Sequence, residues 1–479
     1  MNKPIILLTD EQIQHFIVEG YIQIKADFDE PVHEGIHAKI EEVFEQEGNT
    51  GNNILPRVPE IQRVFDHPRV HGAFTSLLGD DYILNPHRHC HLRSPGWNGG
   101  GWHKDNYTNT HNLRQPRFRW VMALYYPTEV TPEMGPTGVL RRRHFFQGIS
   151  DPDASKTTEE ELGLCGDTGT VNIVHFDVFH RAIPNLSNRT RNMLKFQFVR
   201  MKEPTGPSWD AQDDTWRTPV DDDARPAALD VWNWLHGKQA NGVFNGKDID
   251  QLFRVLETGK EENRFAAAYQ IGALGESCVE RLLVSLVKEA EEKEETFLEP
   301  CPANVHGYNP TALHAANALT AVGPPAFKAV LEHVTHEHWL VRLSLVDVLA
   351  NMGSAAAEAV PTLTSLFDDG HERVSRAAAM ALGQIGVPDE KSVSSLLEKV
   401  DDDDPLMRKA AMFSLAQTGI ESSASIEIFR QTLNDEDRYN RYYAALALRR
   451  MRTPEANEVL LDSLFTSRWC PITDANNKY

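Results

Sequence analysis

The C-terminal half of the chain repeats with a period of 33 residues. Leucines and glycines recur at this spacing, at Leu349, Leu382, Leu415 and Leu448 and at Gly353, Gly386 and Gly419. Alanine-rich segments at 264–275 and 312–323 look like two earlier copies, separated by an insertion that contains the acidic run 289–295. Such a period is typical of an α-solenoid, in which each helix pair buries its apolar face only against its neighbours. We therefore expect residues 249–479 to form a stack of helix pairs.

The first two hundred residues show a different pattern. Thr9 and Gln12 have the spacing of a capping box, which predicts a helix leading into a strand at 21–24. Residues 31–47 predict a second, amphipathic helix. Short apolar runs broken by Gly, Pro and Asn follow, at 118–126, 171–177 and 193–199. Because such runs are typical of strands, we expect residues 1–205 to form an all-β core behind a helical cover.

Residues 206–248 are rich in Pro, Asp and Trp and predict a linker or lid with one short helix at 229–235, stopped by Gly237. Four tryptophans in this segment could close over a site or pack between the domains: Trp209, Trp216, Trp232 and Trp234.

Composition bounds the class of protein. A chain of 479 residues is too long for one ordinary core, which predicts two domains. Its 5 cysteines form no closely spaced pair, so we expect a reducing compartment and a cytoplasmic location. The net charge of −21 argues against a nucleic-acid-binding protein, and no apolar stretch is long enough to span a membrane.

One cluster of residues predicts a metal site. His103 and Asp105 alternate along an extended segment after Trp102, so their side chains point to the same side, and His180 lies on a later predicted strand. Two histidines and one carboxylate are the ligand set of non-heme Fe(II) oxygenases, which leaves positions open for cosubstrate and dioxygen.

Two other motifs compete for a metal. His175 and Asp177 repeat the same spacing, but little chain remains for a third ligand, so we expect His175 to pack near the site. His33, Glu34 and His37 fit the short pattern of zinc proteases on a helix. These histidines flank the apolar stripe, so the better interpretation is a solvated helix face.

The N-terminal half resembles the phytanoyl-CoA dioxygenase family of Fe(II)/2-oxoglutarate oxygenases, and the repeats resemble HEAT repeats. The similar segments are Leu8 to Gln12 with Glu19 to Tyr21, Trp102 to Asp105, Gly135 to Thr137, and His180 to Asn192. This resemblance implies a double-stranded β-helix, or jelly roll, with His103, Asp105 and His180 as iron ligands. It also implies that Arg191 binds the distal carboxylate of 2-oxoglutarate, a role that suits the forked guanidinium.

The chain departs from the family pattern at three places. Arg141 to Arg143 and His144 replace a Pro-Gly-Ser-His segment, Lys104 replaces a glutamine, and Ala182 stands where many family members carry a hydroxyl side chain. None of these changes removes a ligand. The presence of Asp105 rather than Ala or Gly favours hydroxylation over halogenation.

The resemblance implies an oxidoreductase that uses Fe(II), 2-oxoglutarate and O2, hydroxylates a small organic substrate, and releases succinate and CO2. Residues 82–147 carry nine basic and three acidic side chains, which predicts an anionic substrate. Two alternatives remain open. One is a protein or peptide hydroxylase that uses the solenoid as a docking module for its protein partner, and the other is a non-catalytic HEAT-repeat scaffold.

Overall fold

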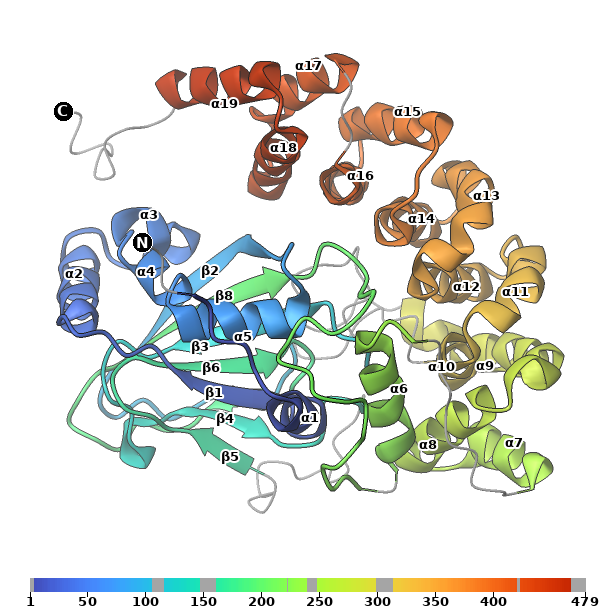
Figure 1. The fold of residues 1–479 in the computed structure, drawn as a ribbon, viewed down its shortest axis with the longest axis horizontal. Coiled ribbons are helices and arrows are strands. Elements are labelled where there is room, and N and C mark those ends of the chain that lie inside the picture. Colours follow the sequence, from blue (N-terminus) through green and yellow to red (C-terminus); the bar gives the residue numbers. More distant parts are fainter. Residues whose placement is uncertain are drawn as a thin grey trace.

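The computed structural model describes residues 4–105, 116–146, 161–221, 223–238, 248–298, 313–419 and 423–466. Two parts are visible in Figure 1. The first, here called the β domain, contains two sheets and the helices before them. The second, here called the solenoid, is an arc of paired helices that curves around one side of the β domain. None of the helices in these ranges combines the length and the apolar character needed to cross a membrane.

The β domain begins with the predicted capping box. Thr9 Oγ1 accepts a hydrogen bond from the Gln12 amide, and the Gln12 side chain accepts one from the Thr9 amide, so α1 (Asp10–Glu19) begins where the sequence predicts it. The covering helices then follow: α2 (Val32–Glu47), α3 (Ile54–Arg57), α4 (Ile61–Phe65) and α5 (Pro68–Leu78).

Two antiparallel sheets face each other in the β domain, as predicted for a jelly roll. The larger has the order β1-β6-β3-β8-β2, from β1 (Tyr21–Lys25), β6 (Thr170–His175), β3 (Trp120–Tyr125), β8 (Arg191–Val199) and β2 (Ile83–Arg93). The smaller has the order β5-β4-β7, from β5 (Glu161–Leu164), β4 (Thr137–Leu140) and β7 (His180–Ala182).

Strand alternation divides the side chains of the larger sheet between two environments. One set, including Tyr125 and Phe198, packs against α1 to α5; the Phe74 and Phe198 rings stack with centroids 3.9 Å apart. The other set, including Met122 and Met193, packs toward Val139 of the smaller sheet. This second side, called the inner face below, is where the polar residues of the candidate site lie.

Helix α6 (Arg225–Leu235) connects the two parts. Its tryptophans are buried and hydrogen-bonded: Trp232 Nε1 donates to Asp214 O at 2.8 Å, and Trp234 Nε1 donates to Glu203 Oε2 at 3.0 Å. Trp209 Nε1 likewise donates to Asp10 Oδ1 at 2.7 Å. Through these contacts Trp209, Trp232 and Trp234 pack inside the fold.

The solenoid contains the predicted helix pairs. Its concave row is formed by α8 (Glu261–Gly272), α10 (His314–Val322), α12 (Trp339–Asn351), α14 (Glu372–Ile385), α16 (Pro405–Thr418) and α18 (Arg438–Met451). Its convex row is formed by α7 (Ile249–Thr258), α9 (Val279–Leu298), α11 (Phe327–His333), α13 (Val360–Ser365), α15 (Glu390–Glu398), α17 (Ser423–Thr432) and α19 (Pro454–Thr466). The acidic run 289–295 lies within helix α9, where Glu289 is buried and pairs with Arg264 at 2.8 Å.

The repeated residues have repeated roles. Gly386 and Gly419 end α14 and α16 in the left-handed conformation, at φ 76° and 65°, which only glycine adopts without strain. Arginines at the start of the concave helices pair with aspartates of the next unit, Arg342 with Asp369 at 2.7 Å and Arg408 with Asp435 at 3.1 Å. The period in the sequence is therefore the period of the contacts that join neighbouring units.

The concave row of the solenoid packs on the β domain (Figure 1). The rings of Trp120 in β3 and Phe413 in α16 stack with centroids 6.3 Å apart. Arg117, just before β3, makes a bidentate ion pair with Asp230 of α6, both bonds 2.8 Å long, and also donates to Asn351 O of α12 at 3.3 Å. The two parts thus share one continuous interior.

Candidate metal centre

The backbone brings His103 beside His180. His103 lies just outside any strand and forms an isolated antiparallel bridge with His180 at the start of β7. The His103 amide donates to His180 O at 3.0 Å, and the His180 amide donates to His103 O at 2.9 Å. Their imidazole rings consequently lie with centroids 4.3 Å apart. The predicted strand around His103 is thus a single bridge, but it has the predicted effect on the side chains.

Asp105 completes the cluster. Its Oδ1 lies 3.8 Å from His103 Nε2 and 3.6 Å from His180 Nε2, and one potential ligand atom from each residue lies within 4.8 Å of the others. Neighbouring ligands of an octahedral ion with bonds of about 2.1 Å are separated by about 3 Å, so a small contraction would enclose a divalent ion. Among the described residues, this is the one group of three or more acidic, His or Cys side chains with such spacing.

Both imidazoles are oriented by the backbone. His103 Nδ1 lies 3.0 Å from Gly101 O, and His180 Nδ1 lies 3.1 Å from Val178 O. A carbonyl oxygen can only accept, so each Nδ1 carries the proton and each Nε2 presents its lone pair to Asp105. This is the arrangement by which proteins fix the tautomer of metal-binding histidines.

The protonation states also suit metal binding. Burial alone would raise the pKa of Asp105, but the Lys195 ammonium and the neighbouring histidines hold it well below its ordinary value. Lys195 Nζ lies 2.7 Å from Asp105 Oδ2, which leaves Oδ1 facing the histidines. Burial lowers the pKa of His180 to about 4. Near neutral pH the cluster therefore combines an anionic carboxylate with a neutral His180.

Arg191 begins β8 and is fully buried. Its Nε donates to Gly135 O at 3.1 Å, whereas its two terminal nitrogens have no hydrogen-bond partner among the described residues. A buried guanidinium without acceptors is costly, and a ligand carboxylate would supply two acceptors in the matching geometry. Arg189, by contrast, is exposed and lies 3.5 Å from Glu129.

The inner face of β2 carries polar residues that sequence reasoning missed. His87, His89 and His91 alternate along the strand, and His89 pairs across the sheet with Lys195. The rings of His89 and His91 lie 4.5 Å apart, and each has one buried nitrogen without a partner. Their alternating spacing was visible in the sequence, but only the strand register shows that they line the same face as Lys195.

The competing motif, His175 and Asp177, packs beside the segment that carries His103 and Asp105. His175 Nδ1 accepts from the Asp177 amide at 3.0 Å, and its ring lies 4.8 Å from the buried His144 ring. Asp177 Oδ2 lies 2.6 Å from Lys104 Nζ, so the lysine between His103 and Asp105 points away from the ligands. Lys104 therefore forms a buried ion pair with Asp177.

The zinc-protease pattern on α2 makes no site. His33 is 7% exposed, with Nδ1 2.7 Å from Tyr125 Oη and Nε2 2.6 Å from Ala26 O. His37 lies apart, 3.5 Å from Glu41. The expectation of a solvated helix face is wrong for His33, because both of its ring nitrogens are used inside the β domain.

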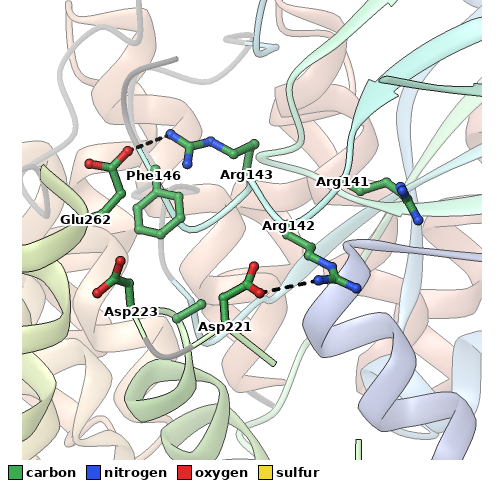
Figure 2. A pocket seen from close by; sticks show the side chains of 8 residues that line it. Arg141, Arg142, Arg143, Phe146, Asp221, Asp223 and Glu262 are labelled. Atoms are coloured by element: carbon green, nitrogen blue, oxygen red, sulfur yellow. Dashed lines mark hydrogen bonds and ion pairs between the residues drawn. The ribbon is translucent and has the colours of Figure 1, made fainter. Parts of the chain in front are cut away.

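The arginines of the basic segment 82–147 do not gather at the metal cluster. Arg141, Arg142 and Arg143 line a separate cavity of about 260 Å³, none of whose lining residues belongs to the cluster (Figure 2). Arg142 pairs with Glu19 at 2.7 Å, and Arg143 pairs with Glu262 of α8 at 3.0 Å. Ion pairs thus occupy the charges that led to the expectation of an anionic substrate, while Arg114 lies outside the described residues.

Comparisons with known proteins agree with this geometry. The family model of phytanoyl-CoA dioxygenase matches residues 20–193, and the model of HEAT repeats matches residues 325–416 and 393–469. A search of curated proteins finds no significant match.

Solved structures with a similar fold are non-heme enzymes. The α-ketoglutarate-dependent carbocyclase SnoK from nogalamycin biosynthesis is 18% identical, with 41% of this chain and 85% of that chain covered at a TM-score of 0.34. HygX from Streptomyces hygroscopicus with nickel and 2-oxoglutarate bound is 16% identical, with 45% and 96% covered at 0.34. A nickel complex of the monooxygenase ThoJ is 15% identical, with 46% and 94% covered at 0.32. The family models themselves show a phytanoyl-CoA dioxygenase domain at residues 20–193 and HEAT repeats at residues 325–469, and the chain is an oxidoreductase.

Proposed function

We propose that this protein is an Fe(II)- and 2-oxoglutarate-dependent dioxygenase that hydroxylates a small organic substrate and releases succinate and CO2. The observation that carries the proposal is the pairing of two features inside one sheet sandwich. One is the cluster of His103, Asp105 and His180, and the other is the buried, unpartnered end of Arg191. The match of residues 20–193 to the phytanoyl-CoA dioxygenase family model gives the proposal further support.

The roles of the residues follow from their contacts. His103 Nε2, His180 Nε2 and Asp105 Oδ1 would hold the iron, and Arg191 would bind the distal carboxylate of 2-oxoglutarate through its two free nitrogens. Bound iron, with 2-oxoglutarate and O2, supplies the oxidation of a C–H bond. Three protein ligands leave coordination positions for the cosubstrate and dioxygen.

Lys195 has a positioning role in this account. Its ion pair with Asp105 Oδ2 keeps the carboxylate ionised and turns Oδ1 toward the histidines. The Nδ1 contacts to Gly101 O and Val178 O do the same for the imidazoles. These contacts are made by the chain's own residues, so they can hold the metal-binding atoms in position.

The position of the solenoid favours a small substrate over a folded protein. Its concave surface, the usual binding surface of such arrays, is seated on the β domain of the same chain. Tyr443 Oη of α18 donates to Asn85 Oδ1 of β2 at 3.0 Å, and Arg450 pairs with Asp81 at 2.6 Å. A polypeptide docked on the concave row would have to displace these contacts.

A non-catalytic scaffold has less support. The two terminal nitrogens of Arg191 are buried without a hydrogen-bond partner among the described residues, which lowers the stability of the fold. In a protein without catalytic activity, no function would offset this loss of stability.

Metal binding tests the proposed ligands without requiring a substrate. The purified chain should bind one Fe(II) under anaerobic conditions, and His180→Ala should lower the affinity at least tenfold, since one of three ligands is lost. His37→Ala is the matched control, because His37 lies outside the cluster. Equal affinity in the His180→Ala and control variants would overturn the ligand assignment.

A further inference from the structure

The last repeats place two aromatic helix faces on the β domain. Phe413 of α16 stacks on Trp120 of the β domain. Residues four apart lie on the same face of a helix, so Lys409 of α16 also faces the β domain. Tyr439 and Tyr443 are related in the same way on α18, and both reach β2. Side chains of the solenoid therefore form part of the wall opposite the inner face of β2.

Tyr439 connects this wall to the neighbourhood of the metal cluster. Its Oη lies 2.8 Å from His87 Nδ1. His87 precedes His89 by one strand repeat, and His89 pairs across the sheet with Lys195, whose ammonium lies 2.7 Å from Asp105. The path from Tyr439 to Asp105 thus runs along one face of one sheet.

Lys409 is a buried cation that makes no direct ion pair with a described residue. It is 4% exposed, and its ammonium lies 4.2 Å from the centre of the Tyr439 ring. It forms no ion pair or hydrogen bond with any residue that the structure describes. Burial lowers its pKa to about 8, since nearby Asp437 offsets only part of the lost hydration. A contact with one aromatic ring replaces only part of that hydration.

A second unpartnered donor lies on the larger sheet, beside Asn85, which Tyr443 contacts. Gln197 of β8 is 1% exposed; its Oε1 accepts from Asn85 Nδ2 at 2.9 Å, and Asn85 Oδ1 accepts from Tyr443. The Gln197 amide nitrogen has no hydrogen-bond partner in the described part of the chain. Arg438, which lies 5.0 Å from the Tyr439 ring, adds a second positive charge beside Lys409. Unused donors and positive charge together match a ligand with acceptor oxygens.

We propose that the solenoid supplies a subsite for the anionic group of the substrate, in which Lys409 binds a carboxylate or phosphate against the ring of Tyr439. This inference rests on the proposed function and names its substrate class as small organic anions. The acceptor oxygens lie against Lys409 and Gln197, while the carbon to be oxidised lies toward Asp105. The repeats thereby determine specificity, and the β domain performs the oxidation.

The test is a binding titration of the full chain, with saturating 2-oxoglutarate present so that Arg191 is occupied. The probes are acetate, benzoate and inorganic phosphate, which separate carboxylate from phosphate recognition. At least one should bind saturably, and Lys409→Gln should weaken that binding at least tenfold. Lys391→Gln is the matched control, because Lys391 is an exposed lysine on α15. Saturable binding by none of the three, or equal binding by Lys409→Gln, would overturn the subsite.

Two further variants separate this role from others. Lys409→Met should leave the melting temperature of the ligand-free chain unchanged or higher, because it removes a buried ammonium that lacks a partner. A marked decrease in melting temperature, with anion binding retained, would assign Lys409 a structural role instead. His103→Ala should bind the anion as the wild type does. Its failure to bind iron therefore tests the metal centre alone, and loss of anion binding in Lys409→Gln tests the subsite alone.

Discussion

The unpaired nitrogens of Arg191 make one substitution especially informative. Arg191→Lys keeps the positive charge but loses the fork that can bind both oxygens of a carboxylate. Loss of one charge-assisted hydrogen bond, about 1.5 kcal/mol, should raise the KM for 2-oxoglutarate by about tenfold. Steady-state kinetics of succinate release measures this effect. Arg189→Lys, at an exposed position, should leave the constant unchanged, and an equal effect of both variants would contradict the assignment.

A substitution of Lys195 tests its ion pair with Asp105. Lys195→Met leaves the carboxylate of Asp105 buried without its cation, and removing one partner of a buried ion pair destabilises a fold by about 3 kcal/mol. Chemical unfolding of the metal-free chain should show this loss. Adding Asp105→Leu should restore most of the stability, because no charge then remains buried. A double variant less stable than Lys195→Met would show that the pair is not the cause.

The turns between repeats determine where the helices of the solenoid start. Asp404 caps α16 by accepting a hydrogen bond from the Leu406 amide at 3.0 Å, and it also pairs with Arg376 of the preceding unit. Asp404→Ala should therefore destabilise the solenoid by about 1–2 kcal/mol, measured as a lower thermal midpoint. Asp403→Ala, at an exposed position in the same acidic turn, is the control. Equal effects of the two substitutions would contradict the capping role.

Elements with a local signal were predictable from the sequence. The capping box predicted α1, the period of Leu and Gly located the repeat helices, and the short apolar runs located β3, β6 and β8. Helices α3 to α5 were not predicted, because they are short and their burial against the larger sheet depends on contacts distant in sequence.

The candidate site was predictable to the same extent. Motif spacing predicted that His103, Asp105 and His180 lie together, as they do in the structure, and the family resemblance added Arg191. Lys195 and Lys409 have no local signal, because their roles depend on strand register and on the position of the solenoid. The charge count of 82–147 could not show that Arg117 and Arg143 pair with acids of α6 and α8.

The β domain and the solenoid stabilise each other through shared contacts. Arg117 is 7% exposed and joins β3, α6 and α12 through Asp230 and Asn351 O. Calorimetry of the full chain should show a single main transition, and Arg117→Met should lower its midpoint by leaving Asp230 buried and unpaired, at a cost of about 3–5 kcal/mol. Arg63→Met removes an exposed pair with Glu30 and should have little effect. Two separate transitions in the wild type would contradict the shared interior.

In the proposed enzyme, His103, Asp105 and His180 form the catalytic metal centre. The most direct measurement is succinate formed from 2-oxoglutarate by the Fe(II)-loaded full chain under O2, compared with the His103→Ala and Asp105→Ala variants and with His37→Ala as the control. We expect the wild type and the His37→Ala control to form succinate. Both ligand variants should form it at least about a hundredfold more slowly, with folds that remain intact by circular dichroism. Undiminished succinate release by both ligand variants would contradict this assignment.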